Sequence, residues 1–197
     1  MKIFYIYLFS IILFFLSSCQ DNGKTKKIEG TNDNETSFFP VTDFLKGQLR
    51  ELDSMPLTPL KTITSKKKTD SVWLKRGNIR EFATPFLTPV FDSANMSSYY
   101  TSKSFLDQTI NSFTLTYDAN KNLPGNIFLQ HVNIYIDPQT NTVDRIYLEK
   151  EKMVGDTNVI TQLTWKTNEF CSIRTIKQMP GTDPEITEEK MIWNFDK

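Results

Sequence analysis

The sequence predicts an α+β fold in which an antiparallel meander of about five to seven strands packs on one or more helices. Two observations predict this fold class. One stretch after residue 40 has the spacing of an amphipathic helix, and five runs rich in β-branched and aromatic residues, separated by short turns, fill the last third of the chain. Because antiparallel sheets commonly cover one face and leave the other in water, we expect the helices on one face only.

The first residues of the chain are typical of a secretory signal. Lys2 gives a positive start, and the stretch 3–16 is apolar except for Ser10. This run is shorter than the roughly 20 apolar residues that a membrane-spanning helix needs. We therefore expect residues 1–18 to be a signal peptide.

The sequence Leu16-Ser17-Ser18-Cys19 resembles the lipobox of bacterial lipoproteins, in which small residues separate an aliphatic residue from a cysteine. This resemblance implies that Cys19 becomes the mature N-terminus and carries diacylglycerol on its sulfur, with a further acyl chain such as palmitate on its amine. Each buried methylene adds about 0.8 kcal/mol of membrane affinity, so several chains would anchor the protein firmly. The site residue expected here is the lipidated Cys19.

The composition of the remaining chain resembles that of many uncharacterised lipoproteins of Bacteroidota. Residues 19–37 are mostly charged, Asn, Thr, Ser and Gly, and this composition predicts a flexible tether. Residues 38–197 are sufficient for a single globular domain. The resemblance implies a lipid-anchored protein of the cell envelope, with the outer membrane favoured over the inner one.

Residues 42–55 form the strongest helix signal, because Leu45, Leu49 and Leu52 recur at helical spacing between a Thr42 N-cap and Pro56. Two short strand-like runs, 60–64 and 71–75, flank a lysine-rich loop and predict a hairpin. Further elements predicted from apolar spacing are a short helix over 79–86 interrupted by Pro85, a second helix over 105–113, and a strand over 113–118. The five clearest strands are expected near 131–137, 143–150, 158–166, 169–178 and 188–195.

The alternation of apolar residues sets the register between the first two of these five strands. Placing Ile134 opposite Ile146 brings their apolar sides to one face, and a slip by one residue would mix the faces. The opposite face then collects a polar and aromatic set, which is the candidate surface for a ligand or partner: His131, Asn133, Tyr135, Arg145, Tyr147 and Glu149.

Composition and motifs exclude several kinds of function. Acidic and basic residues balance at 23 each, which argues against a nucleic-acid partner. The chain has two cysteines and one histidine, so we expect no disulfide framework and no metal site, and it has no glycine-rich loop that would bind a nucleotide cofactor. Cys171 is expected to be a buried apolar side chain, and Trp165 and Trp193 are expected in the core.

The leading hypothesis is a non-enzymatic binding or scaffold domain, anchored to the membrane through the Cys19 lipid, for an envelope protein or a polymer such as a glycan. One alternative is an envelope hydrolase that uses carboxylates and His131, with Glu149 orienting the imidazole. Another is a carrier of an apolar ligand held between helix and sheet, which would need a sizeable cavity there.

Overall fold

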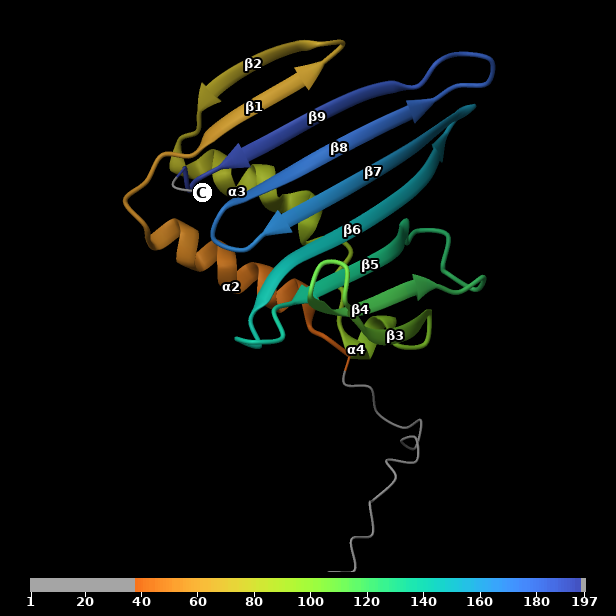
Figure 1. The fold of residues 1–197 in the computed structure, drawn as a ribbon. Coiled ribbons are helices and arrows are strands. Elements are labelled where there is room, and N and C mark those ends of the chain that lie inside the picture. Colours follow the sequence, from red (N-terminus) through yellow and green to blue (C-terminus); the bar gives the residue numbers. More distant parts are fainter. Residues whose placement is uncertain (1–37, 196–197) are drawn as a thin grey trace, which may run out of the picture. The chain divides into compact units, whose positions relative to one another are not determined.

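A nine-stranded antiparallel sheet organises residues 38–195, the part of the chain that the computed structural model describes (Figure 1). The signal peptide (1–18), the Cys19 lipidation site and the tether (19–37) lie outside the described residues and stay predictions. None of the helices within 38–195 is long and apolar enough to cross a membrane.

The strands are β1 (Leu60–Ser65), β2 (Lys68–Trp73), β3 (Tyr100–Asp107), β4 (Ser112–Ala119), β5 (Leu129–Ile136), β6 (Val143–Val154), β7 (Thr157–Lys166), β8 (Phe170–Gln178) and β9 (Glu185–Ile192). The helical elements are α2 (Val41–Ser54), α3 (Arg76–Ala83), the 3-10 turn η2 (Thr84–Phe86) and α4 (Ser93–Met96). From β3 to β9 each strand pairs with the next one in the chain, and the β1–β2 hairpin extends the sheet beside β9. The predicted antiparallel meander is therefore present.

The predicted fold class is wrong in two respects: the sheet has nine strands rather than about five to seven, and strands dominate, so the described chain is mostly β rather than α+β. The main cause is the segment 105–113, where we predicted a helix and the structure has the end of β3, a turn and the start of β4. Asp107 accepts a hydrogen bond from the Thr109 amide, and Asn111 takes a φ of +48°, so the chain reverses here. Leu106 and Ile110 are about half exposed, so their helical spacing does not face a core.

Helix α2 confirms the helix predicted from leucine spacing, since Leu45, Leu49 and Leu52 are all buried. The predicted N-cap is wrong. Pro40 occupies that position, and Thr42 lies inside the first turn, where its hydroxyl oxygen accepts a hydrogen bond from the Phe91 amide at 2.7 Å. Thr42 therefore fixes the loop before α4 against α2.

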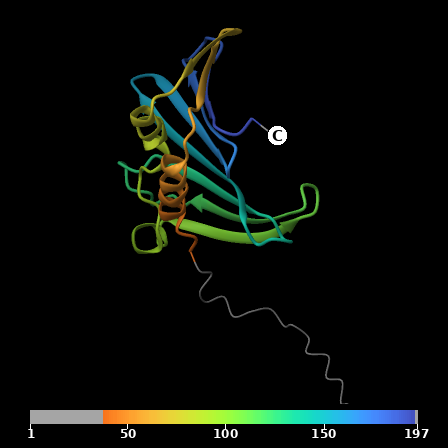
Figure 2. The same ribbon diagram turned by 90° about the vertical axis from the view of Figure 1, so that its left-hand side faces the viewer.

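The helices lie against one face of the sheet, as Figure 2 shows. Trp165 on β7 is fully buried there, with its ring 5.5 Å from Phe86 of η2 and 5.4 Å from Trp193. The same core contains Cys171, which is fully buried, and burial raises the pKa of its thiol. The expected core positions of Trp165, Trp193 and Cys171 are confirmed.

The β1–β2 hairpin turns through Lys66 and Lys67 alone, while Lys68 already pairs with Ser65 as part of β2. The loop is thus shorter than the sequence indicated. Both turn residues have positive φ, +47° and +66°, as a two-residue turn with primed geometry requires.

Candidate functional site

The register predicted between β5 and β6 is confirmed residue by residue. Ile134 lies opposite Ile146, and both are buried against the helices. On the other side of these strands the pairs are Tyr135 with Arg145, Asn133 with Tyr147, and His131 with Glu149. We refer to these six residues as the polar face.

Tyr135 and Arg145 form a stacked pair on the polar face. The guanidinium carbon of Arg145 lies 4.2 Å from the centroid of the Tyr135 ring, within the range of a cation–π interaction. The Asn133 amide nitrogen donates a hydrogen bond to the Tyr135 hydroxyl at 3.2 Å. These contacts hold the tyrosine ring between the two strands.

A second group of contacts extends across β6 and β7. The Tyr147 hydroxyl donates to the Glu149 carboxylate at 2.6 Å, and the Gln162 side-chain amide donates to the same oxygen at 3.1 Å. Burial raises the pKa of Tyr147, and the neighbouring Glu149 carboxylate raises it further, so the phenol stays protonated and acts as a donor. Gln162 is not part of the predicted surface, because the sequence sets a register only between β5 and β6.

His131 makes its hydrogen bond to a partner that the sequence analysis did not include. Glu149 lies opposite it in the ladder, as predicted, but the imidazole Nδ1 is 2.6 Å from the Asp118 carboxylate on β4. Asp118 pairs with His131 across the β4–β5 ladder, whereas Glu149 is engaged by Tyr147 and Gln162. The sequence predicts the strand 113–118 but sets no register between it and β5, so it does not indicate this contact.

The polar face is half-buried rather than fully exposed. On it and beside it lie buried polar atoms that have no hydrogen-bond partner among residues 38–195. Asn133 Oδ1 and Arg145 Nε are two of these, and the hydroxyl of Thr114, which lies opposite Tyr135, is a third. Each such atom costs free energy, about 1–3 kcal/mol, unless water or a ligand satisfies it. They lie around the Tyr135–Arg145 stack.

The chemistry available on the polar face is that of hydrogen bonding and stacking. Within residues 38–195 no group of three or more His, Cys, Asp or Glu side chains could hold a metal ion. Asp118 and His131 have the arrangement of a base and its orienting carboxylate, but no hydroxyl or thiol of the described residues donates a hydrogen bond to the imidazole.

No family model matches this sequence, and neither a curated protein nor a solved structure matches it. Inferences about function therefore depend on the contacts described above and on the sequence signals at the N-terminus.

Proposed function

We propose that the protein is a lipid-anchored, non-enzymatic binding domain of the bacterial cell envelope that recognises an envelope protein or polymer through the polar face. The observation that carries this proposal is the cluster formed by the Tyr135–Arg145 stack and the unpaired buried atoms around it. Anchoring would come from Cys19, as the lipobox resemblance implies.

The contacts on the polar face suit recognition of a hydroxyl-rich or peptide surface. Tyr135, Arg145 and Tyr147 offer planar groups, and the amide of Asn133 can both donate and accept hydrogen bonds. Tyrosine and arginine are the side chains that most often dominate binding energy at protein interfaces. Both are held in place here by neighbours on the same sheet, so little ordering would be needed on binding.

The lipid anchor is tested by growing cells with an alkyne-labelled palmitate and comparing the native chain with Cys19→Ser. We expect label and membrane association in the native chain and neither in the variant. Labelling that persists in Cys19→Ser would exclude Cys19 as the acylated residue.

The partner is tested by crosslinking in cells that express the native chain, followed by mass spectrometry for proteins and by sugar analysis for polymers. The double variant Tyr135→Ala/Arg145→Ala should lose the captured partner. Arg174→Ala is the matched control, because Arg174 lies on the same side of the sheet on β8 and is exposed. A partner captured equally by all three chains would remove the polar face from the interface.

An envelope hydrolase is the second candidate, and the 2.6 Å contact between His131 and Asp118 favours it. In that case His131 would act as a general base whose tautomer is set by the carboxylate. His131→Gln should then abolish hydrolysis of a simple ester such as 4-nitrophenyl acetate, and Asp118→Asn should lower it. Equal rates in the native chain and both variants would exclude this candidate.

A further inference from the structure

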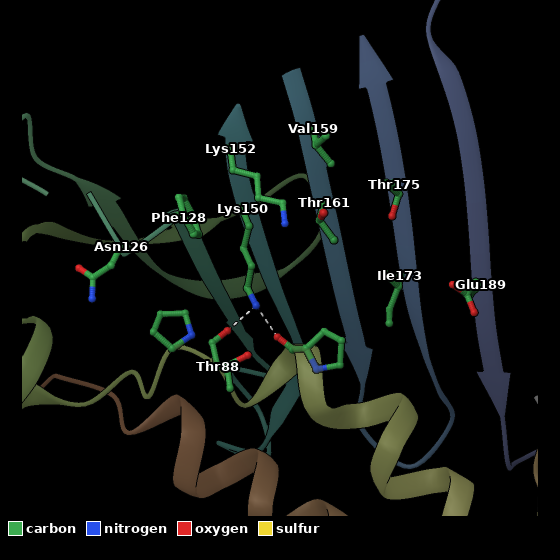
Figure 3. Close-up of a pocket in the computed structure, with 12 residues that line it drawn as sticks. Thr88, Asn126, Phe128, Lys150, Lys152, Val159, Thr161, Ile173, Thr175 and Glu189 are labelled. Carbon is green, nitrogen blue, oxygen red and sulfur yellow. Dashed lines mark hydrogen bonds between the residues drawn. The ribbon is translucent and has the colours of Figure 1, made fainter. Parts of the chain in front are cut away.

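A groove lies on the helix-covered side of the sheet, on the face opposite to the polar face. Strands β6 to β9 continue past the end of η2, and the groove lies between them and the loop that follows η2 (Figure 3). Its volume is about 540 Å³, which is within the usual range for small-molecule sites. Pro85 of η2, together with Thr88 and Pro89 of the following loop, forms the side opposite the strands, which we call the loop side.

Lys150 on β6 extends into this groove. Its ammonium donates hydrogen bonds to the backbone carbonyls of Pro85 and Thr88, as the dashed lines in Figure 3 show. No Asp or Glu of the described residues forms an ion pair with it. Two of the three ammonium N–H groups thus donate to neutral carbonyl oxygens, and the third can donate to a ligand.

The surroundings of Lys150 do not neutralise its charge. Lys152 lies two residues along the same strand and extends over the same groove (Figure 3). Burial and, to a smaller extent, the Lys152 charge together lower the pKa of Lys150 to about 8. Glu189 also lines the groove, but its carboxylate is 2.5 Å from the Lys61 ammonium and is already paired.

The remaining walls of the groove are mixed, and their polar members are Thr88, Asn126, Thr161 and Thr175. Phe128, Val159 and Ile173 present hydrocarbon on the sheet side, and Pro85 and Pro89 present it on the loop side. The groove therefore combines two lysine side chains with apolar surface on both its sheet side and its loop side. A ligand with a single negative head and an apolar body would bring a counter-charge to Lys150 and bury hydrocarbon against these side chains.

We propose that this groove binds a small amphiphilic anion, with its head on Lys150 and Lys152 and its apolar body against Phe128, Val159 and Ile173. This site is distinct from the polar face and does not depend on the function proposed for it. Free fatty acids and lipid phosphate monoesters share the required chemistry.

The test is calorimetric titration of the full-length protein in lipid nanodiscs with octanoate, with empty nanodiscs as the blank. We expect saturable binding with one site per chain. Octanol, which lacks the charge, and octyltrimethylammonium, which reverses it, should bind at least about tenfold more weakly, because each loses a charge-assisted hydrogen bond. Octyl phosphate tests a phosphate head in place of the carboxylate. The anion that binds more tightly shows whether the natural ligand is a fatty acid or a lipid phosphate monoester.

Substitutions test whether octanoate binds in the groove. Lys150→Met should weaken octanoate binding at least about tenfold, whereas Lys150→Arg should retain most of the binding. Lys121→Met is the control, because Lys121 is exposed and lies outside the groove, and it should leave binding unchanged. Val159→Trp should fill the groove while position 150 stays lysine, and it should also abolish binding. The test therefore stands even if Lys150→Met fails to fold. The proposal is overturned if octanoate shows no saturable binding above the blank, or if it binds equally well to folded Val159→Trp.

Discussion

Arg145 on β6 places its guanidinium carbon 4.2 Å from the ring centroid of Tyr135, its direct partner across the β5–β6 ladder. This stack is partly desolvated, so the cation–π attraction between the two side chains should be worth about 0.5–2 kcal/mol. Arg145 Nε is also buried without a hydrogen-bond partner in the described part of the chain, so removing the arginine both loses an attraction and relieves a cost. A single substitution cannot separate the two effects.

A double-mutant cycle separates them. We expect Tyr135→Leu and Arg145→Met to show a coupling free energy of about 0.5–2 kcal/mol in urea unfolding. The control cycle replaces Arg145→Met with Arg174→Met, which lies on β8 and should show no coupling to Tyr135. Zero coupling in the first cycle would mean that the stack does not contribute to stability.

Trp165 should be the most costly tryptophan to remove. It is fully buried between Phe86 and Trp193, and truncation of such a residue to alanine typically costs about 3–5 kcal/mol. Trp73 is 60% exposed on the edge strand β2, so Trp73→Ala should cost less than about 1 kcal/mol. Urea unfolding of the two variants compares the effects directly, and similar midpoints would contradict the burial seen here.

The parts of the fold that were predictable from sequence are those where side-chain alternation and burial agree. Ile134 and Ile146 mark the buried side of β5 and β6, and their pairing determines which residues form the polar face on the other side. The segment 105–113 was mistaken for a helix because Leu106 and Ile110 are apolar at helical spacing but exposed, so spacing carried no information about a core. Local turn geometry at Asn111 decided the structure instead.

The contacts that the sequence could not reveal are those between strands whose register the alternation of side chains leaves open. Asp118 reaches His131 only because β4 lies beside β5, and nothing in the spacing of the two residues indicates a contact. In the groove, Lys150 donates hydrogen bonds to the backbone carbonyls of Pro85 in η2 and Thr88 in the following loop, which are more than sixty residues away from it in the chain. Such pairings are set by tertiary packing.

The β1–β2 turn should be open to stabilisation. Lys66 and Lys67 both take positive φ, a conformation that costs most L-residues about 1–2 kcal/mol, whereas Asn-Gly adopts it readily. We expect Lys66→Asn/Lys67→Gly to raise the free energy of unfolding by about 1 kcal/mol. The control Lys66→Gln/Lys67→Gln removes the same charges without easing the backbone, so an equal gain there would assign the effect to charge.

Cys171 should report opening of the core. Its side chain is fully buried and burial raises the pKa of its thiol, so it should react very slowly with a thiol reagent such as Ellman's reagent in the folded protein. In a Cys19→Ser chain Cys171 is the remaining cysteine of the two in the sequence. Its labelling rate should rise with urea in parallel with unfolding. Rapid labelling under native conditions would show that the sheet and helices separate locally.

The depressed pKa of Lys150 gives stability a specific pH dependence. The folded-state pKa is about 8, below the ordinary lysine value of 10.5. Between these two pH values the unfolded chain binds more protons at this position than the folded chain, so the free energy of unfolding rises with pH there. Below pH 8 the amine is protonated in both states, and the cost of burying its charge is present in full.

Comparison with Lys150→Met isolates this contribution, because the other groups that titrate in the alkaline range are common to both chains. We expect the native chain to gain stability relative to Lys150→Met as pH rises from about 8 to about 10.5, measured by urea unfolding at each pH. An anion bound at Lys150 would favour the protonated amine and raise its pKa. Saturating octanoate should therefore reduce this gain, and an unchanged pH profile with octanoate present would place any bound anion away from Lys150.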